Sequence, residues 1–339
     1  MTAIHQAIQL VSQAQNLPSE LMRETMQQIM TGQSSPEQIA GLLIGLAAKG
    51  ETVDEIIAAA EVMRELATGV SGIEHELTDI VGTGGDGASL FNVSTASAFV
   101  AAAGGAYIAK HGNRSVSSKS GAADVLEAAG VRLDLAPEKI AAAVDSMRIG
   151  FLFAPAHHSA MRHAVKPRQE LGVRTLFNVI GPLTNPAGAK RQVLGVYDKR
   201  WLKPLAEALH QLGSEHVLVI HSRDGLDEFS IAAPTDVAEL NNGQIHEWTF
   251  DPSAVRIDGS LDKLKVANAG ESLALIRQVL SGEPGAAADI IALNAGAALY
   301  VAGQAANMQQ GIAEARTTLQ SGRALKLLQA YADWSQLPP

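Results

Sequence analysis

Apolar residues in the first seventy positions recur at the spacing of an amphipathic helix, so this block is expected to be helical. One helix should have Ser35 as its N-cap, Pro36 as its first residue and Gly50 as its stop. The next should open at Thr52, which stands three residues before a glutamate as in a capping box, and end at Gly69. Neither helix carries a recognisable chemical motif, and the block is interpreted as a packing or dimerisation module.

The pattern changes after Gly72, where short β-rich runs alternate with helical stretches. The expected strands are "LTDIV", "AYIAK", "QVLGVY" and "HVLVIH", and the expected helices cover 94–103, 120–129, 137–147 and 201–212. Such alternation predicts an α/β fold with an open, mostly parallel sheet and helices on its faces. The tail, "DIIALNAGAALYVAG" and "GIAEARTTLQSGRALKLLQAYADW", is expected to form two more helices.

A Pro- and Gly-rich segment interrupts this alternation and suggests a split domain. "HAVKPRQELGVRTLFNVIGPLTNPAGA" is expected to form a short helix followed by turns, and to return to the helical module. The prediction is a small helical, dimerisation domain at 1–72, joined by about 165–187, and a larger α/β domain at 73–164 and 188–339.

Composition excludes several classes of protein. The chain of 339 residues is 47% hydrophobic and 18% charged, which is typical of a globular protein. It contains no cysteine, which excludes disulfides, thiolate zinc sites and cysteine nucleophiles and fits a cytoplasmic location. A formal charge of −9 argues against a general nucleic-acid binder, and no apolar run is long enough to span a bilayer.

The segment "VGTGGDG" follows the first expected strand and raises the question of nucleotide binding. Gly82, Gly84 and Gly87 have the G-x-G-x-x-G spacing, but a dinucleotide site also needs an acidic residue about twenty positions later. No carboxylate occurs between Asp86 and Asp124. A Walker loop is excluded as well, because Ala-Ser follows the last glycine where Lys-Ser or Lys-Thr is required.

The remaining interpretation is an anion-binding site formed by backbone amides. Glycines let amide N–H groups crowd around a phosphate, and the start of the following helix adds partial positive charge. Asn92, Ser94 and Thr95 stand where N-cap residues belong, so they could cap the helix, bind the anion or do both. The alternative is a tight turn with an ordinary cap, but four glycines exceed what a turn needs.

A second polar run ends the next expected strand. "KHGNRSVSSKS" places Lys110, His111 and Asn113 there. The cations and hydroxyls that follow before the next helix are Arg114, Ser117, Ser118, Lys119 and Ser120. Cations and hydroxyls at the carboxyl end of a strand suit a phosphorylated ligand in an open α/β crevice. Ser120 alone fits a helix cap at least as well, and His111 alone is more often structural than catalytic.

Adjacent carboxylates follow the strand "HVLVIH". In "HSRDGLDEFS", Asp227 and Glu228 stand side by side on an expected loop, where they could share hard cations. Magnesium favours carboxylate and phosphate oxygens, which would match a phosphorylated substrate. An isolated Asp-Glu pair is, however, usually a solvated surface feature.

The motifs "GTGGDG…FNVST", "KHGNRSVSSKSGAADVLE", "RQELGVRTLFNVIGPLTNP" and "DGLDE" resemble those of the anthranilate phosphoribosyltransferase family. The resemblance runs in order over nearly the full chain. It implies transfer of the phosphoribosyl group of 5-phosphoribosyl-1-pyrophosphate (PRPP) to anthranilate, releasing pyrophosphate, in tryptophan biosynthesis. It also implies a cytoplasmic homodimer with Mg²⁺, two ions per subunit, and no nucleic-acid or membrane partner.

The resemblance further implies three sets of binding residues and no covalent or general-base catalyst. The PRPP set is Gly82, Thr83, Gly84, Gly85, Asp86, Asn92, Ser94, Thr95, Lys110 and Ser118. The anthranilate set is Gly82, His111, Asn113, His158 and Arg168. The metal set is Ser94, Asp227 and Glu228.

Within these motifs some positions compete or depart from the family pattern. Asp224 is a weaker metal candidate, and Arg174 is a rival to Arg168 for the anthranilate carboxylate. Pro155 falls where the family lines its anthranilate channel, and Met161 stands where some relatives place a tyrosine.

Two other functions fit the same fold. A pyrimidine nucleoside phosphorylase-like enzyme would also use a glycine loop and a Lys/Ser-rich anion site, but it would need no paired magnesium carboxylates. A non-enzymatic relative that binds nucleic acid would show a basic groove and an eroded magnesium motif.

Overall fold

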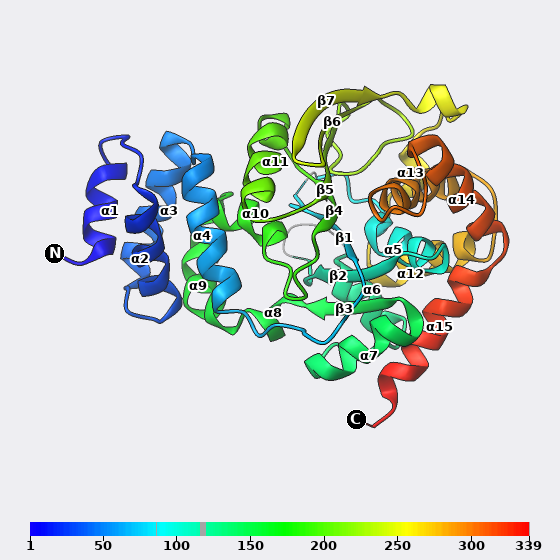
Figure 1. The fold of residues 1–339 in the computed structure, drawn as a ribbon, viewed down its shortest axis with the longest axis horizontal. Helices are drawn as coiled ribbons and strands as arrows, with labels where there is room; N and C mark the ends of the chain where they lie inside the picture. Colours follow the sequence, from blue (N-terminus) through cyan, green and yellow to red (C-terminus); the bar gives the residue numbers. More distant parts are fainter. Residues whose placement is uncertain (86, 116–119, 339) are drawn as a thin grey trace.

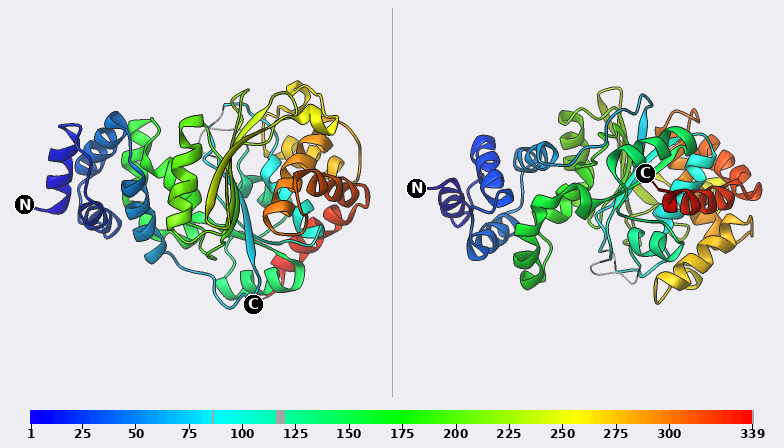
Figure 2. Two further views of the ribbon diagram at one scale, coloured as in Figure 1. Left: turned by 45° about the horizontal axis from the view of Figure 1, so that its top comes forward. Right: turned by 90° about the horizontal axis from the view of Figure 1, so that it is seen from below.

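The computed structural model describes residues 1–85, 87–115 and 120–338, and it has a helical end and a larger end built on a sheet (Figure 1). The helical end begins with α1 (Ala3–Val11), α2 (Ser19–Met30), α3 (Pro36–Lys49) and α4 (Val53–Glu65). Figure 2 shows the two ends from other sides, with the N-terminus at the tip of the helical end and the C-terminus beside the sheet.

The start signals of α3 and α4 are confirmed. The hydroxyl of Ser35 accepts a hydrogen bond from the Gln38 amide, and Thr52 and Glu55 form the expected capping box. The expected end of α4 at Gly69 is wrong, because the helix ends four residues earlier. Beyond it the backbone turns to partners elsewhere in the chain, such as the His157 carbonyl, which accepts from the amide of Thr68 at 2.8 Å.

The larger end contains one seven-stranded sheet, which confirms the predicted fold class. Its strand order is β3-β2-β1-β4-β5-β6-β7; the first five strands are parallel, and β6 and β7 are antiparallel. The strands are β1 (Leu77–Gly82), β2 (Tyr107–Gly112), β3 (Ile149–Phe153), β4 (Arg191–Gly195), β5 (His216–Ser222), β6 (Thr235–Asn241) and β7 (Gln244–Phe250).

The four strands expected from the sequence are β1, β2, β4 and β5, and the other three were not predicted. A turn signal was available for the β6–β7 hairpin, because Asn242-Gly243 is the favoured dipeptide of a two-residue turn. Both residues have positive φ, +51° and +75°.

Helices cover the faces of the sheet (Figures 1 and 2). They include α5 (Val93–Ala103), α6 (Ala122–Ala128), α7 (Pro137–Met147), α11 (Leu202–Gln211), α12 (Ala269–Leu280), α13 (Ala286–Val301), α14 (Met308–Gln320) and α15 (Arg323–Gln336). The last segment was expected to form one helix, but it is divided between α14 and α15 at Gly322, where φ is +68°. None of the helices within the described ranges is long and apolar enough to cross a membrane.

Two short helices from the middle of the chain, α9 (Arg162–Leu171) and α10 (Leu176–Ile180), pack on the helical end. The single turn α8 (Ala154–His157) precedes them and packs against β3. Ala164 of α9 and Phe177 of α10 are buried in one apolar cluster with Leu42 of α3 and Ile56 of α4. This packing supports the predicted return of 165–187 to the helical module, although the division into two domains stays a prediction.

Candidate active site

The carboxyl ends of β1, β2 and β5 meet at one edge of the sheet, because these strands are parallel. The glycine loop follows β1, the KHGN run closes β2, and the loop with Asp227 and Glu228 follows β5. The fold therefore gathers three of the four motif segments at the place where open α/β sheets bind their ligands.

Asp227 lies directly on the glycine loop. Its Oδ2 atom accepts a hydrogen bond from the Gly84 amide at 2.8 Å. A Cβ atom on Gly82 would lie 2.4 Å from the same oxygen, and a Cβ on Gly195 would lie 1.5 Å from the Asp227 carbonyl oxygen. Gly82 and Gly195 face each other across β1 and β4, so two bare positions let the carboxylate approach the loop.

Gly195 was not among the predicted site residues. The available signal was its place inside the strand "QVLGVY", because a glycine within a strand often marks the close approach of another backbone.

The other side of the glycine loop contacts the segment between α9 and α10. The guanidinium of Arg174 donates to the Gly85 carbonyl and lies 4.0 Å over the Tyr197 ring. Thr83 is held nearby, because its hydroxyl accepts from the Tyr197 amide at 3.0 Å. Arg174 therefore contacts the loop expected to bind PRPP, a contact that sequence reasoning did not predict.

The start of α5 is capped as expected. Asn92 is the N-cap, and its side-chain oxygen accepts from the Thr95 amide at 3.0 Å and from the Ser94 hydroxyl at 3.4 Å. The Thr95 hydroxyl is buried and has no hydrogen-bond partner in the described part of the chain. Capping thus accounts for Asn92, while Ser94 keeps a lone pair for a ligand.

Lys110 connects the α5 start to β1 from inside the protein. Its ammonium donates to the Ile80 carbonyl and to the Ser94 hydroxyl, and only 3% of the residue is exposed. Burial lowers the pKa of Lys110 to about 8, against the opposing attraction of Asp79, Glu228 and Asp227. The Lys110 ammonium is therefore close enough to Asp227 and Glu228 to interact with them electrostatically.

The paired carboxylates suit magnesium bound together with a substrate. Asp227 and Glu228 are half-buried and offer hard oxygen ligands, as does the Ser94 hydroxyl. Among the described residues no three His, Cys, Asp or Glu side chains gather as a metal site, so phosphate oxygens would have to complete the coordination. Asp224 points to its own loop, where its carboxylate accepts from the Ser230 hydroxyl at 2.6 Å.

Arg168 is a half-buried cation at the end of α9. Its guanidinium lies 5.3 Å from the centre of the Phe177 ring, and burial lowers the pKa of Arg168. Within the described ranges it forms no ion pair, and Glu170, its expected surface partner, instead lies 3.8 Å from Lys166. A desolvated guanidinium without a carboxylate is suited to bind an anionic ligand.

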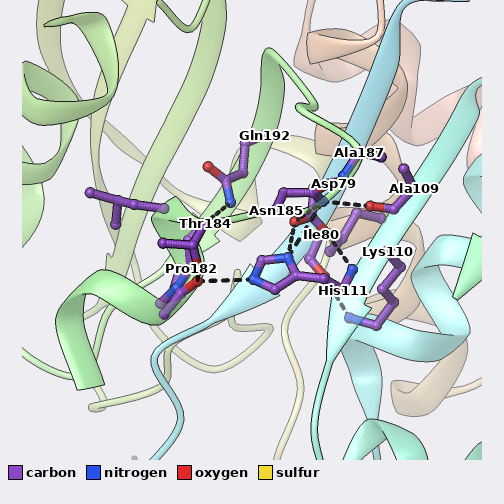
Figure 3. Close-up of polar contacts among 12 residues, drawn as sticks. Asp79, Ile80, Ala109, Lys110, His111, Pro182, Thr184, Asn185, Ala187 and Gln192 are labelled. Carbon is purple, nitrogen blue, oxygen red and sulfur yellow. Dashed lines mark hydrogen bonds and ion pairs between the residues drawn. The ribbon is translucent and has the colours of Figure 1, made fainter. Parts of the chain in front are cut away.

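His111 follows Lys110 in β2, and the two side chains point to opposite faces of the sheet. Lys110 reaches α5, whereas the His111 ring lies between Asp79 and the Gly181 carbonyl, which accepts from Nε2 at 3.1 Å (Figure 3). The carboxyl end of β2 therefore presents Lys110 to the α5 side of the sheet and His111 to the turn after α10.

The other residues predicted to bind anthranilate or line its channel differ in burial and in their hydrogen bonds. His158 is buried, its Nε2 atom lies 3.0 Å from the Thr184 carbonyl, and burial lowers the pKa of His158 to about 4, which keeps the ring neutral near pH 7. Asn113 is exposed, and its side-chain oxygen accepts from the amide of the next residue. Pro155 is exposed and Met161 half-buried.

Two residues near the KHGN run are used differently from the prediction. Arg114 is paired with Glu127 at 2.7 Å and is not available as an unpaired cation. Ser120 does not cap α6, whose N-cap is Gly121. Four predicted positions lie outside the described residues: Asp86, Ser117, Ser118 and Lys119.

Nearly the whole chain is similar to known proteins. Residues 74–325 match the model of the glycosyl transferase family a/b domain, and residues 5–67 match its helical bundle domain. The chain is 57% identical over 333 residues to the anthranilate phosphoribosyltransferase of Thioalkalivibrio sulfidiphilus, covering 98% of each chain. It is 58% identical over 326 residues to that of Alkalilimnicola ehrlichii, covering 96% of each. The chain belongs to the anthranilate phosphoribosyltransferase family.

Solved structures of anthranilate phosphoribosyltransferases share the whole fold. The enzyme of Thermus thermophilus superimposes with a TM-score of 0.93 at 45% identity, covering 99% of this chain and 100% of the other. The Saccharomyces cerevisiae enzyme in complex with PRPP and Mg gives 0.88 at 26% identity, covering 98% and 97%. The same yeast enzyme in complex with 4-fluoroanthranilate gives 0.87 at 25% identity, covering 98% of each.

Proposed function

We propose that this chain transfers the 5-phosphoribosyl group of PRPP to the amine of anthranilate at the edge of the sheet formed by β1, β2 and β5. The products are N-(5-phosphoribosyl)anthranilate and pyrophosphate, and the reaction belongs to tryptophan biosynthesis. The observation that carries the assignment of the site is the contact of Asp227 with the glycine loop, which brings a magnesium-type carboxylate to an anion cradle.

The donor half binds PRPP through backbone and small polar groups. The backbone at Gly84 and Gly85 and the partial positive charge at the start of α5 favour the pyrophosphate, which would share the Gly84 amide with Asp227. Gly82 and Thr83 belong to the proposed set as loop residues, because the Thr83 amide already donates to the Gly195 carbonyl at 2.9 Å. Lys110 contributes a positive charge beneath the loop and fixes the Ser94 hydroxyl at 3.1 Å. Asp86, Asn92, Thr95 and Ser118 complete the proposed set.

Asp227, Glu228 and the Ser94 hydroxyl would hold Mg²⁺, and the proposed number is two ions per subunit. Magnesium, when bound, supplies positive charge that stabilises the developing pyrophosphate leaving group. The half-buried position of the two carboxylates limits their solvation and strengthens their interaction with a cation.

The acceptor half holds anthranilate by its carboxylate. Arg168 would form two parallel hydrogen bonds to it, while His111, Asn113 and His158 line the approach. The amine nitrogen forms a bond to C1 of the ribose as the bond from C1 to pyrophosphate breaks, with its electron pair leaving on oxygen. The nitrogen then releases one proton. Placement and electrostatic stabilisation carry the reaction without a covalent intermediate.

The test is consumption of anthranilate, followed by its fluorescence, in the presence of PRPP and Mg²⁺. Parallel reactions with thymidine and phosphate, and a nucleic-acid gel shift, examine the two other functions of this fold. We expect turnover only with anthranilate and PRPP. Asp227→Ala combined with Glu228→Ala should abolish the magnesium-dependent rate, whereas Glu314→Ala, exposed on α14, should not. Near-normal turnover of the double variant would contradict the metal assignment.

The cellular setting is also part of the proposal. A homodimer formed through the helical module of 1–72 and about 165–187, and a cytoplasmic location, agree with a soluble biosynthetic enzyme without cysteine. Size-exclusion chromatography with light scattering measures the first of these directly.

A further inference from the structure

A fully buried carboxylate lies behind the proposed site and takes no part in the function described so far. Asp79, the third residue of β1, is 0% exposed. Its Oδ1 atom accepts from the His111 backbone amide at 3.2 Å, and its Oδ2 accepts from the His111 ring Nδ1 and from the Asn185 side-chain amide at 2.8 Å (Figure 3). In the described part of the chain it forms no ion pair with lysine or arginine.

The donors to Asp79 tie a turn from the helical side to the sheet. Asn185 also donates to the Ala109 carbonyl of β2 at 2.8 Å. The His111 ring reaches the Gly181 carbonyl at the other end of the same turn. The 181–185 turn is thus fixed at both ends to β1 and β2, and both ends reach one carboxylate, directly at Asn185 and through the His111 ring at Gly181 (Figure 3).

The orientation of the His111 ring depends on this carboxylate. Both ring nitrogens lie against oxygen acceptors, Asp79 on one side and the Gly181 carbonyl on the other. A hydrogen bond at one ring nitrogen sets the orientation and the hydrogen placement of the other. Without the charge of Asp79, the ring would lose the partner that aims its Nε2 atom at the turn.

The turn continues directly into the acceptor half of the site. Gly181 follows the last residue of α10, and Phe177 of α10 carries the Arg168 guanidinium against its ring. A continuous series of contacts therefore runs from Asp79 through His111 and α10 to Arg168. The glycine loop touches this series at one point, because Arg174, between α9 and α10, donates to the Gly85 carbonyl. Its other contact, with Asp227, lies outside the series.

We infer that Asp79 is a positioning residue for the acceptor substrate, an aromatic amine that carries a carboxylate, and that it acts through His111. This inference rests on the proposed function. Asp79 would hold the segment that carries Arg168 in line with the PRPP-binding half of the site, across the carboxyl ends of β1 and β2. The expected signature is a larger loss for anthranilate than for PRPP, because the contact of the PRPP loop with Asp227 does not pass through Asp79.

The first experiment compares steady-state constants of the full chain and of Asp79→Asn. We expect the KM for anthranilate to rise about tenfold and kcat to fall, with the KM for PRPP unchanged within about twofold. The matched control is Glu239→Gln, since His216 and Glu239 form a second His–carboxylate pair in the same sheet, at 2.9 Å. The control should lose thermal stability without a change in either KM. Equal changes of both KM values in Asp79→Asn would overturn the inference.

The second experiment tests whether Asp79 acts through His111. In the His111→Gln background, Asp79→Asn should cause little further change in the KM for anthranilate, whereas independent roles would give multiplied effects. Asn185→Ala removes one donor and leaves Asp79 charged, so it should raise the same KM by a smaller factor. That variant serves as the test if Asp79→Asn does not fold, and an unchanged KM there would count against the inference.

The outcome separates this inference from the proposed function. An inactive wild-type chain would end both. An active wild-type chain whose Asp79 and His111 variants combine independently would end the inference alone.

Discussion

The Oδ2 atom of Asp227 accepts a hydrogen bond from the Gly84 amide at 2.8 Å, which joins the loop after β5 to the loop after β1. Asp227, a proposed metal ligand, thus accepts the hydrogen bond of an amide that is also proposed to bind the pyrophosphate. The carboxylate and a pyrophosphate oxygen would compete for this amide unless a cation lies between them.

This competition predicts a reversal of affinity with magnesium. Without a divalent cation, pyrophosphate should bind Asp227→Asn about fivefold more tightly than the wild type, because about 1 kcal/mol of charge repulsion is removed. With Mg²⁺ the order should reverse, since the variant lacks a metal ligand. Isothermal titration calorimetry with and without Mg²⁺ measures both. The same order under both conditions would show that the contact with Gly84 has no functional meaning.

Gly195→Ala should damage the site through the backbone of Asp227. The added methyl group would lie 1.5 Å from the Asp227 carbonyl oxygen, so the loop after β5 must move. We expect kcat/KM for PRPP to fall at least about tenfold and stability to fall by about 1–3 kcal/mol. In Gly41→Ala the methyl group would meet only the Ile8 side chain at 4.0 Å. Its kcat/KM should stay near wild type, and its stability should be equal or up to about 1 kcal/mol higher, because alanine is favoured over glycine inside a helix. Activity is measured by anthranilate fluorescence and stability by urea unfolding.

Arg168→Ala should act on anthranilate and spare PRPP. Hydrogen bonds to a charged group contribute about 1.5–3 kcal/mol, which corresponds to a rise of about 10- to 150-fold in the KM for anthranilate. The control is Lys166→Ala on the same helix, because Lys166 forms only an exposed pair with Glu170. A larger effect on the KM for PRPP than on the KM for anthranilate would contradict the assignment.

The lowered pKa of Lys110 predicts a loss of activity toward PRPP at alkaline pH. Because burial lowers its pKa to about 8, the ammonium loses its proton above that pH and kcat/KM for PRPP should fall. Stability should change in the opposite direction. The unfolded chain keeps this proton up to about the ordinary pKa of 10.5, so it binds more protons than the folded chain between about pH 8 and 10.5. Unfolding free energy should therefore rise across that window.

The matched variant is Lys110→Met, which should remove the alkaline limb and the stability gain together. The pH profile of the steady-state rate measures the limb, and urea titrations at pH 7.5 and 9.5 measure the stability. A wild-type profile that stays flat to pH 9.5 would contradict the role of the charged lysine.

The sequence predicted elements whose signals are local. The cap at Asn92 and the starts of α3 and α4 depend on side chains a few positions apart, so they could be predicted. The end of α4 could not, because its linker bonds to the distant His157 carbonyl. β3 also went unrecognised, and it pairs with β2, which lies on the other side of α6 and α7 in the chain. β6 and β7 were missed although their local turn signal, Asn242-Gly243, was available.

The same distinction holds for the site. Motif spacing and family resemblance brought Asp227 and Glu228 into the prediction. The roles of Asp79 and Arg174 depend on tertiary contacts, with His111 and with the Gly85 carbonyl respectively. Gly195 had the general signal of a glycine within a strand, but its partner Asp227 could not be predicted. No pattern along the chain expresses such contacts.

The burial of α9 and α10 against the N-terminal helices sets the order in which the newborn chain can mature. Domains fold as they emerge from the ribosome, beginning with the N-terminus. Leu42 and Ile56 would wait for Ala164 and Phe177, which are synthesised only after β1, β2 and β3. Until those residues emerge, we expect the apolar side chains of α3 and α4 that they cover to be exposed to water, and such exposure favours chaperone binding during synthesis.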